Sequence, residues 1–157
     1  MSFEIPIDSI SVSGHKFLGS PIPCGIVMAL KNNVDRIARS IAYIGNLDTT
    51  ISGSRNGLTP LILWQTICSL GHDGLAERVA EALSLTDYAV AQMTRSGIQV
   101  HRNLNAITLY FSAPRREVVE RWQLATNKGM SHIIMVPGTS RELLDRFIKD
   151  VADDNRT

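Results

Sequence analysis

Cysteine is scarce in this chain of 157 residues, which contains only Cys24 and Cys68. The two lie far apart, each in an apolar stretch, and no Cys or His residues are paired at the spacing of a metal site. We therefore expect no bound metal. Because free cysteine is among the most buried residue types, we also expect both thiols to be buried and reduced, as in a cytoplasmic protein.

An excess of charge of one sign is also missing. The chain has 16 basic and 15 acidic residues, interspersed along its length, and a formal net charge of +1. A nucleic-acid-binding surface normally shows basic clusters. No apolar run reaches the roughly 18 residues of a membrane span, and the opening MSFEIPIDS does not have the pattern of a signal peptide. These absences favour a cytoplasmic protein with neither a nucleic-acid nor a membrane partner.

The pattern that is present is that of an α/β protein. Alternating apolar residues predict an antiparallel strand pair at residues 9–12 and 25–30. A long helix should begin with Thr59 as N-cap and Pro60 in its first turn, be interrupted or kinked at residues 71–74, and end before Gly97. The rest of the pattern predicts helices at 31–46, 114–129 and 139–154, and strands at 98–102, 106–111 and 132–137.

The last of these helices has a defined start and a defined apolar face. Thr139 and Glu142 match a capping box, and five apolar residues at helical spacing are expected to face the core: Leu143, Leu144, Phe147, Ile148 and Val151. With the preceding strands and helix, this segment should form a two-layer α/β sandwich. The strand pair near the N-terminus has no such cover and leaves edges unpaired. We therefore expect the C-terminal part of a larger fold, or a chain that covers itself by forming oligomers.

The stretch SVSGHKFLGSPIPCG, residues 11–25, places Lys16 in the turn between the first two strands. A lysine fixed at a strand end can attack carbonyls, and lysines hold pyridoxal phosphate as a Schiff base. Ser13 and His15 can donate hydrogen bonds to a phosphate, and Gly14 lets the backbone come close to a ligand. Judged on these residues alone, a solvated turn lysine is the alternative.

Three segments resemble a known family. SISVSGHKFLGSPIPCGIV, residues 9–27, resembles the cofactor-lysine segment of the pyridoxal-phosphate-dependent group II decarboxylases, in which a His-Lys pair holds the Schiff-base lysine. TTISGSRNGLTPLILW, residues 49–64, and ERWQLATNKGMSHIIMVPGTS, residues 120–140, fit the same family in the right order. The similarity is closest to the bacterial histidine decarboxylases, with the plant serine decarboxylases related.

This resemblance implies the C-terminal part of an aspartate aminotransferase-like, fold-type I enzyme. Residues 1–55 would be the end of the large cofactor-binding domain, with the last strand pair of its sheet. Residues 56–96 would be a connecting helix at the subunit interface, and residues 97–157 the small α/β domain. A homodimer or a higher homo-oligomer is implied as well.

The resemblance also implies the roles of individual residues. Lys16 would form the Schiff base with pyridoxal phosphate, His15 would contact the cofactor phosphate, and Ser13 would be a further contact. Ser54 would lie near the substrate or phosphate at the subunit interface, with Arg55 as an interface anchor.

The implied reaction is decarboxylation of L-histidine to histamine and carbon dioxide. Serine or another amino acid is the alternative substrate, because the same motifs occur in both groups. In the small domain, residues 103–108 would face the substrate, with Ala106 near a position where some family members have serine. The family's aspartate for the pyridine nitrogen precedes the lysine, and no matching residue occurs upstream of Lys16. The chain by itself is therefore expected to be inactive, and a fragment that acts only in assembly is a further alternative.

Overall fold

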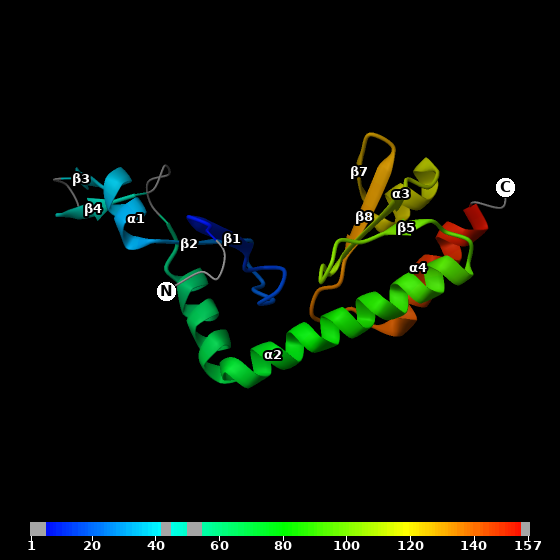
Figure 1. Cartoon of the computed structure of the whole chain (residues 1–157), viewed down its shortest axis with the longest axis horizontal. Helices are drawn as coiled ribbons and strands as arrows, with labels where there is room; N and C mark the ends of the chain where they lie inside the picture. Colours follow the sequence, from blue (N-terminus) through cyan, green and yellow to red (C-terminus); the bar gives the residue numbers. More distant parts are fainter. Residues whose placement is uncertain (1–5, 42–44, 50–54, 155–157) are drawn as a thin grey trace. The chain divides into compact units, whose positions relative to one another are not determined.

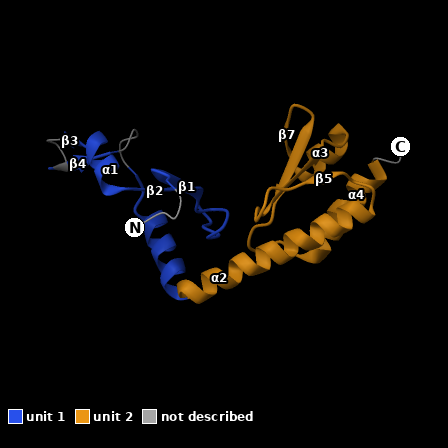
Figure 2. Ribbon diagram, viewed as in Figure 1, with its two compact units in different colours: residues 1–69 blue, residues 70–157 orange. Residues whose placement is uncertain are grey.

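The computed structural model describes residues 6–41, 45–49 and 55–154 (Figure 1). Two compact units are present, residues 1–69 and residues 70–157, and their boundary lies within one long helix, α2 (Leu58–Arg95) (Figure 2). Gly71 interrupts this helix with φ 61° and ψ −167°, a conformation that only glycine adopts readily. The break confirms the interruption expected at residues 71–74. The predicted division at residues 55/56 and 96/97 stays a prediction.

The first unit contains two antiparallel strand pairs. β1 (Ser9–Ser13) pairs antiparallel with β2 (Gly25–Ala29), which confirms the predicted strand pair. In their register Ser13 lies opposite Gly25. Val12 and Ile26 are partners on the half-buried face of this pair. The turn between the two strands carries the candidate lysine. The second pair is formed by β3 (Arg39–Ile41) and β4 (Asn46–Asp48).

The prediction of a helix at residues 31–46 was wrong for the second half of this segment. α1 spans only Lys31–Ile37, and Ala38 is extended, with φ −64° and ψ 131°. None of the α1 residues is buried, and Ile37 is exposed. A short helix gains most of its stability from packing an apolar face. Because this one has no core to pack against, the following residues pair as a strand instead.

The start of α2 is capped differently from the prediction. Thr59 is not the N-cap, because its backbone N–H donates to Asn56 Oδ1 at 2.8 Å and its hydroxyl donates to the same oxygen at 2.8 Å. The carbonyl of Gly57 accepts the bond from the backbone N–H of Leu61 at 3.4 Å. Pro60 therefore lies in the first turn, as predicted, where a missing N–H costs little.

The second unit is a two-layer sandwich with a four-stranded antiparallel sheet. Its strand order is β5-β6-β8-β7, from β5 (Val100–His101), β6 (Thr108–Ser112), β7 (Ala125–Asn127) and β8 (Met130–Ile134). α2 ends at Arg95 and is followed by Gly97, whose φ is 77°; the backbone N–H of Ile98 donates to Met93 O at 2.9 Å, which closes the helix before Gly97 as predicted.

The helix predicted at residues 114–129 was also too long. α3 spans Arg116–Trp122 and ends where Gln123 adopts a left-handed conformation, with φ 50°. Residues 125–127 form β7 and pair with β8 through a tight hairpin, in which Lys128 and Gly129 have φ values of 49° and 76°. Two consecutive residues with positive φ are typical of the tightest hairpin turns. Lys128 and Gly129 therefore connect two strands of a sheet and do not end a helix.

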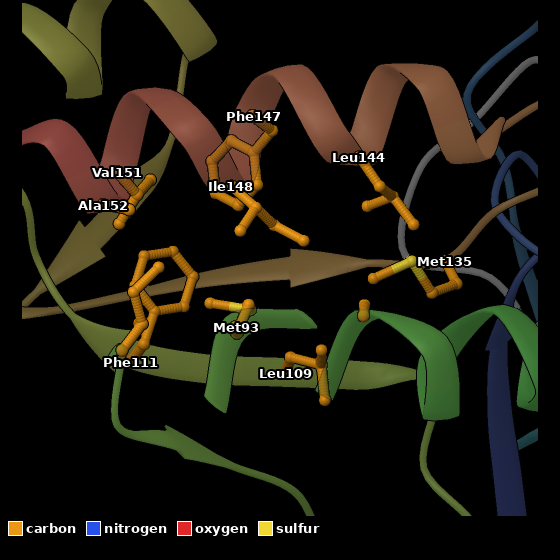
Figure 3. Packing of buried hydrophobic residues seen from close by; sticks show 11 residues of the cluster. Met93, Leu109, Phe111, Met135, Leu144, Phe147, Ile148, Val151 and Ala152 are labelled. Atoms are coloured by element: carbon orange, nitrogen blue, oxygen red, sulfur yellow. The ribbon is translucent and has the colours of Figure 1, made fainter. Parts of the chain in front are cut away.

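The core of the second unit lies between the sheet and the helices α2 and α4 (Arg141–Asp154), as Figure 3 shows. Met93 from α2 and Leu109 and Phe111 from β6 are completely buried. Phe147 from α4 meets the Phe111 ring edge-on, with centroids 5.9 Å apart. The core face predicted for α4 is confirmed at Leu144, Phe147, Ile148 and Val151.

Two details of α4 differ from the prediction. The cap is one residue later, because the backbone N–H of Leu143 donates to Ser140 Oγ at 3.2 Å. The backbone N–H of Glu142 and the hydroxyl of Ser140 lower the pKa of the Glu142 carboxyl, which lies in the first helical turn. The Leu143 side chain is exposed rather than in the core, because it lies beside the buried stripe.

The end of α4 is joined to the start of α3. The Asp154 carboxylate accepts a 2.8 Å hydrogen bond from the backbone N–H of Arg115 and a second bond from the Arg115 guanidinium. Arg115 is the N-cap residue of α3, so the carboxylate also lies at the positive end of that helix. These bonds lower the pKa of Asp154 and raise the pKa of Arg115.

We expect the second unit to be less stable in acid, because protonation of Asp154 removes this pairing. Because the pKa of Asp154 is lower in the folded chain than in the unfolded chain, its contribution is present above the unfolded pKa. It is lost as pH falls through the folded pKa. Asp154→Asn should lower the melting temperature at neutral pH, with a difference from the parent chain that shrinks below about pH 4. A difference that is constant from neutral pH to acid would contradict this assignment.

Within the described residues, no helix combines the length and the apolar character needed to cross a membrane. In the same part of the chain, no group of three or more His, Cys, Asp or Glu side chains is placed to hold a metal ion.

Candidate functional site

Residues 14–24 form a compact turn between β1 and β2. The backbone N–H of Gly14 donates to Cys24 O at 3.0 Å, and the N–H of Ser20 donates to Gly14 O at 3.1 Å. Ser20 is buried, and its hydroxyl donates to Ile22 O at 2.9 Å. Leu18 is buried as well. The turn is thus held by its own backbone and by two inward-facing side chains, rather than being an open loop.

Lys16 lies on the outer side of this turn. Its backbone N–H donates to Ser13 O at 3.1 Å, which fixes its main chain at the end of β1. The Lys16 side chain is exposed and forms no hydrogen bond or ion pair within the described residues. Ser13 is the half-buried last residue of β1. The turn therefore presents an amine on an ordered backbone, next to a histidine and a serine.

The backbone of Cys24 fixes the orientation and the tautomer of His15. The Nδ1 atom of His15 lies 3.1 Å from Cys24 N and 3.1 Å from Cys24 O. Cys24 O already accepts from Gly14, whereas the N–H of Cys24 has no other acceptor among the described residues. We therefore assign Nδ1 as the acceptor, which puts the proton of a neutral imidazole on Nε2. The exposed His15 Nε2–H is then a donor available to an anion.

Gly14 has a packing role that was not expected. A Cβ atom at Gly14 would lie 2.6 Å from Cys24 Sγ and 3.1 Å from Leu63 Cδ2 of α2. Glycine is therefore needed here for close packing inside the protein, and the approach of a ligand to Gly14 stays a prediction. The contact with Leu63 means that the first part of α2 supports the lysine turn. The sequence indicated that Gly14 is important, but it could not predict this packing, because Leu63 lies far along the chain.

This packing predicts that Gly14→Ala destabilises the turn. The added methyl group overlaps Cys24 Sγ, and overpacking of this kind costs about 1–3 kcal/mol. Adding Cys24→Ala should recover part of the loss, because it removes the overlapping sulfur. Urea unfolding of the two single variants and the double variant measures the coupling between the two sites. Additive losses in the double variant would show that the two residues do not interact.

The second predicted group of residues is only partly described. Ser54 lies outside the described residues, so its proposed place near the substrate or phosphate stays a prediction. Arg55 is described, and its Nη1 atom lies 3.5 Å from Asp48 Oδ1 at the end of β4. This ion pair ties Arg55 to the second strand pair of its own chain. The predicted role of Arg55 as an interface anchor also stays a prediction.

The two thiols do not follow the expectation of burial. Both are free, but Cys24 is only half-buried and Cys68 is exposed. Cys68 lies in α2, where three nearby apolar side chains are also exposed, namely Leu61, Trp64 and Ile67. These apolar side chains of α2 have no cover in the described chain.

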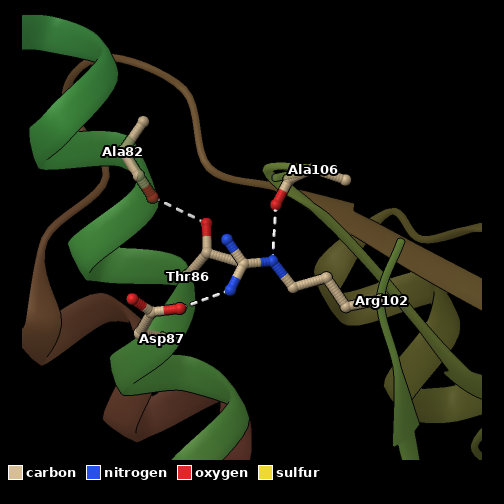
Figure 4. A network of polar contacts seen from close by, with 5 residues as sticks. All are labelled: Ala82, Thr86, Asp87, Arg102 and Ala106. Atoms are coloured by element: carbon tan, nitrogen blue, oxygen red, sulfur yellow. Dashed lines mark hydrogen bonds and ion pairs between the residues drawn. The ribbon is translucent and has the colours of Figure 1, made fainter. Parts of the chain in front are cut away.

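A polar clamp holds the segment predicted to face the substrate (Figure 4). Arg102 donates from Nε to Ala106 O at 2.6 Å and forms an ion pair with Asp87 of α2. Between these ends, Asn105 has a φ of 57° and the Leu104 side chain is 93% exposed. The sequence did not indicate this clamp, because Asp87 and Arg102 belong to different elements. Whether residues 103–108 face a substrate stays a prediction.

The sequence relatives of this chain are decarboxylases. No protein-family model matches the chain. It is 46% identical to the histidine decarboxylase of Morganella morganii over 157 residues, which is 98% of this chain and 41% of that protein. The chain is similar to part of the histidine decarboxylases. This finding confirms the resemblance inferred from the lysine segment. The chain spans about 40% of the length of such relatives.

Two further proteins extend the comparison. Serine decarboxylase 3 of rice, Oryza sativa subsp. japonica, is 36% identical over 152 residues, covering 96% of this chain and 34% of that protein. Among solved structures, L-methionine decarboxylase from Streptomyces sp. 590 in its internal aldimine form has a TM-score of 0.77 and 32% identity. The match covers 94% of this chain and 32% of that one. The predicted α/β fold is thereby confirmed, because it matches part of the fold of this solved decarboxylase.

Proposed function

We propose that this chain is the lysine-bearing part of a pyridoxal-phosphate-dependent decarboxylase that converts L-histidine to histamine and carbon dioxide. The observation that carries the proposal is the ordered turn that presents Lys16 beside His15, in a chain 46% identical to a histidine decarboxylase over 98% of its length. The free thiols Cys24 and Cys68 suit the cytoplasm as the place of this reaction.

The chemistry of the turn fits pyridoxal phosphate. The cofactor needs a primary amine for its aldehyde, which Lys16 offers, and donors for its phosphate. His15 Nε2–H is such a donor by the tautomer argument, and the Ser13 hydroxyl is a second one. The cofactor, when bound, supplies an electron sink for the pair of electrons left by carbon dioxide.

The residues of the turn have separate tasks in this scheme. Lys16 would hold the cofactor covalently through Nζ until the amino group of the substrate takes its place. The free Nζ is then a base or acid that can hold or move a proton beside the substrate. The backbone N–H of Cys24 would hold the His15 ring in place while His15 binds the phosphate. The bonds that hold the turn keep the Lys16 backbone in place throughout.

A chimera tests the proposal in a full-length protein. This chain would replace the matching 41% of the Morganella morganii enzyme. The purified chimera is then given pyridoxal phosphate and L-histidine, and histamine is measured by chromatography. The proposal predicts histamine formation. A folded chimera that releases no carbon dioxide from L-histidine would contradict it.

The same assay separates the alternatives. Ethanolamine formation from L-serine in preference to histamine would favour the serine alternative, for which the 36% identity to the rice enzyme is the supporting observation. Absence of both reactions in a folded chimera would favour a fragment that acts only in assembly. The 157-residue chain alone is expected to form no histamine, because the aspartate expected at the pyridine nitrogen is not among its residues.

Self-association belongs to the proposed function as well. α2 exposes large apolar side chains at intervals of three residues, and Trp64 in this row is 64% exposed. The row consists of Leu58, Leu61, Trp64 and Ile67. Leu61 and Trp64 are neighbours on one side of the helix, and Leu58 and Ile67 extend this exposed apolar surface around it. An exposed apolar surface of this kind marks an interaction site, and we assign it to a second copy of the chain.

Trp64→Glu should weaken this association. A charge placed in the apolar row must lose its water when a second copy covers it, so we expect the dimer dissociation constant to rise about tenfold or more. Sedimentation velocity over a range of concentrations measures the change, with His72→Glu as a control at an exposed site outside the row. A parent chain that is monomeric at every concentration would contradict the assignment.

A further inference from the structure

An apolar cleft in the second unit has no role in the proposed function. It lies among α3, β8 and α4, and its volume is about 150 Å³. Trp122, Leu124, Ile134, Leu143 and Phe147 form most of its wall. An apolar cavity of this size, lined by leucine, isoleucine and phenylalanine, is large enough for one benzene ring. The cleft can therefore take up a single compact apolar group.

A charged cleft adjoins the apolar one. Its volume is about 470 Å³, and Trp122 and Leu143 line both spaces. The other residues around it are Arg121, Arg146, Lys149 and Asp150, three basic side chains and one acidic one, with a net charge of +2. Arg121 Nη1 is paired with Asp150 Oδ2 at 3.2 Å. Within the described chain, Arg146 and Lys149 form no ion pair.

Trp122, which lines both clefts, is held in position. Its Nε1–H donates to Asp150 Oδ2 at 2.8 Å, and its ring meets the Phe147 ring edge-on with centroids 5.3 Å apart. The Asp150 carboxylate is thus occupied by Trp122 and Arg121, which leaves the two unpaired cations to determine the charge at the mouth. A wall that is already ordered loses little entropy when a ligand binds.

We propose that the two clefts together bind a small organic anion with one compact apolar group, such as an arylalkyl carboxylate. The apolar group occupies the 150 Å³ cleft, and the carboxylate lies at the mouth near Arg146 and Lys149. Guanidinium and ammonium groups are the usual partners of carboxylates in proteins. The site lies in the second unit and uses none of the residues of the lysine turn, so it does not depend on the proposed decarboxylation.

Fluorescence of Trp122 tests this site in the whole 157-residue chain. Trp64 is the other tryptophan, so the variant Trp64→Phe makes Trp122 the single reporter. The probe is 3-phenylpropanoate, titrated at constant ionic strength, and its neutral analogue 3-phenylpropanamide. For a ligand of about eleven non-hydrogen atoms we expect a saturable change in emission with a dissociation constant of roughly 1 mM. The amide should bind several-fold more weakly.

Three variants in the Trp64→Phe chain locate the site. Arg146→Gln with Lys149→Gln should weaken binding of the acid by about fivefold, because each charge at an exposed site contributes modestly. Leu143→Asp, which suits the first turn of a helix, should abolish binding by placing a carboxylate between the two clefts. Lys128→Gln removes an exposed charge from the β7–β8 hairpin and should leave binding unchanged.

The binding titrations have results that support the site and results that overturn it. Saturable binding of the acid that is weakened by the double variant and kept by Lys128→Gln supports the site. Equal binding of acid and amide, binding unaffected by the double variant, or no change in Trp122 emission overturns it. Circular dichroism of each variant confirms that the second unit is folded. None of these readouts depends on a cofactor, so a failure here does not bear on the proposed function.

Discussion

Replacing Lys16 with alanine is expected to abolish histamine formation by the chimera that carries this chain. Lys16 would hold the cofactor and would also be the amine that moves a proton at the substrate, so its loss removes two tasks at once. Loss of a positioned acid–base group alone slows a reaction by about 10²–10⁴-fold. Activity should therefore fall at least into that range, and pyridoxal phosphate should wash out more easily on dialysis.

The control for this variant is Lys128→Ala. Lys128 is an exposed lysine in the hairpin between β7 and β8, in the other unit of the chain. It should keep histamine formation within about twofold of the parent chimera, as is usual for surface changes. If Lys16→Ala retained activity close to that of the control, Lys16 would not be the cofactor lysine, and the proposed function would lose its main residue.

Phe111→Ala should destabilise the second unit by about 3–5 kcal/mol. Phe111 is completely buried in β6 and meets Phe147 of α4 edge-on at 5.9 Å, so truncation removes its contacts and leaves a cavity between sheet and helix. Such a loss is a large share of the 5–15 kcal/mol by which domains are usually stable. Urea unfolding, followed by circular dichroism, measures the change.

The neighbouring residue on the same strand supplies the control. Tyr110 is 40% exposed on the opposite face of the sheet, where its ring stacks on His101. Tyr110→Ala should cost less than about 1 kcal/mol, because no core cavity is formed. Similar losses of unfolding free energy for both variants would contradict the packing in which Phe111 faces the core and Tyr110 faces solvent.

The sequence predicted best those elements whose apolar period and end signals agreed. The β1–β2 pair, the break of α2 at Gly71, its end before Gly97 and the core face of α4 all followed from local signals. The two overlong helices had the right period but no sustained core contact. In α1 no residue is buried, and after Trp122 a left-handed Gln123 redirects the chain into a hairpin. Such endings depend on tertiary packing, which the periodicity of the sequence does not contain.

The candidate site divides in the same way. Lys16, His15 and Ser13 lie within four residues, so the sequence could bring them into one turn. The supports of that turn could not be predicted, because Cys24 lies at its far end and Leu63 reaches it from α2. The Arg102 clamp on residues 103–106 likewise joins two elements. The contact between Gly14 and Leu63 suggests why the lysine turn and the first part of α2 occur in one compact unit.

Lys16 is proposed to carry the cofactor, and one measurement tests this role directly. The chimera is loaded with pyridoxal phosphate, reduced with borohydride, digested, and its labelled peptide is identified by mass spectrometry. We predict that the label is on Lys16 alone and is absent after Lys16→Ala. Label on another lysine, or label spread equally over Lys16, Lys31, Lys128 and Lys149, would contradict the account.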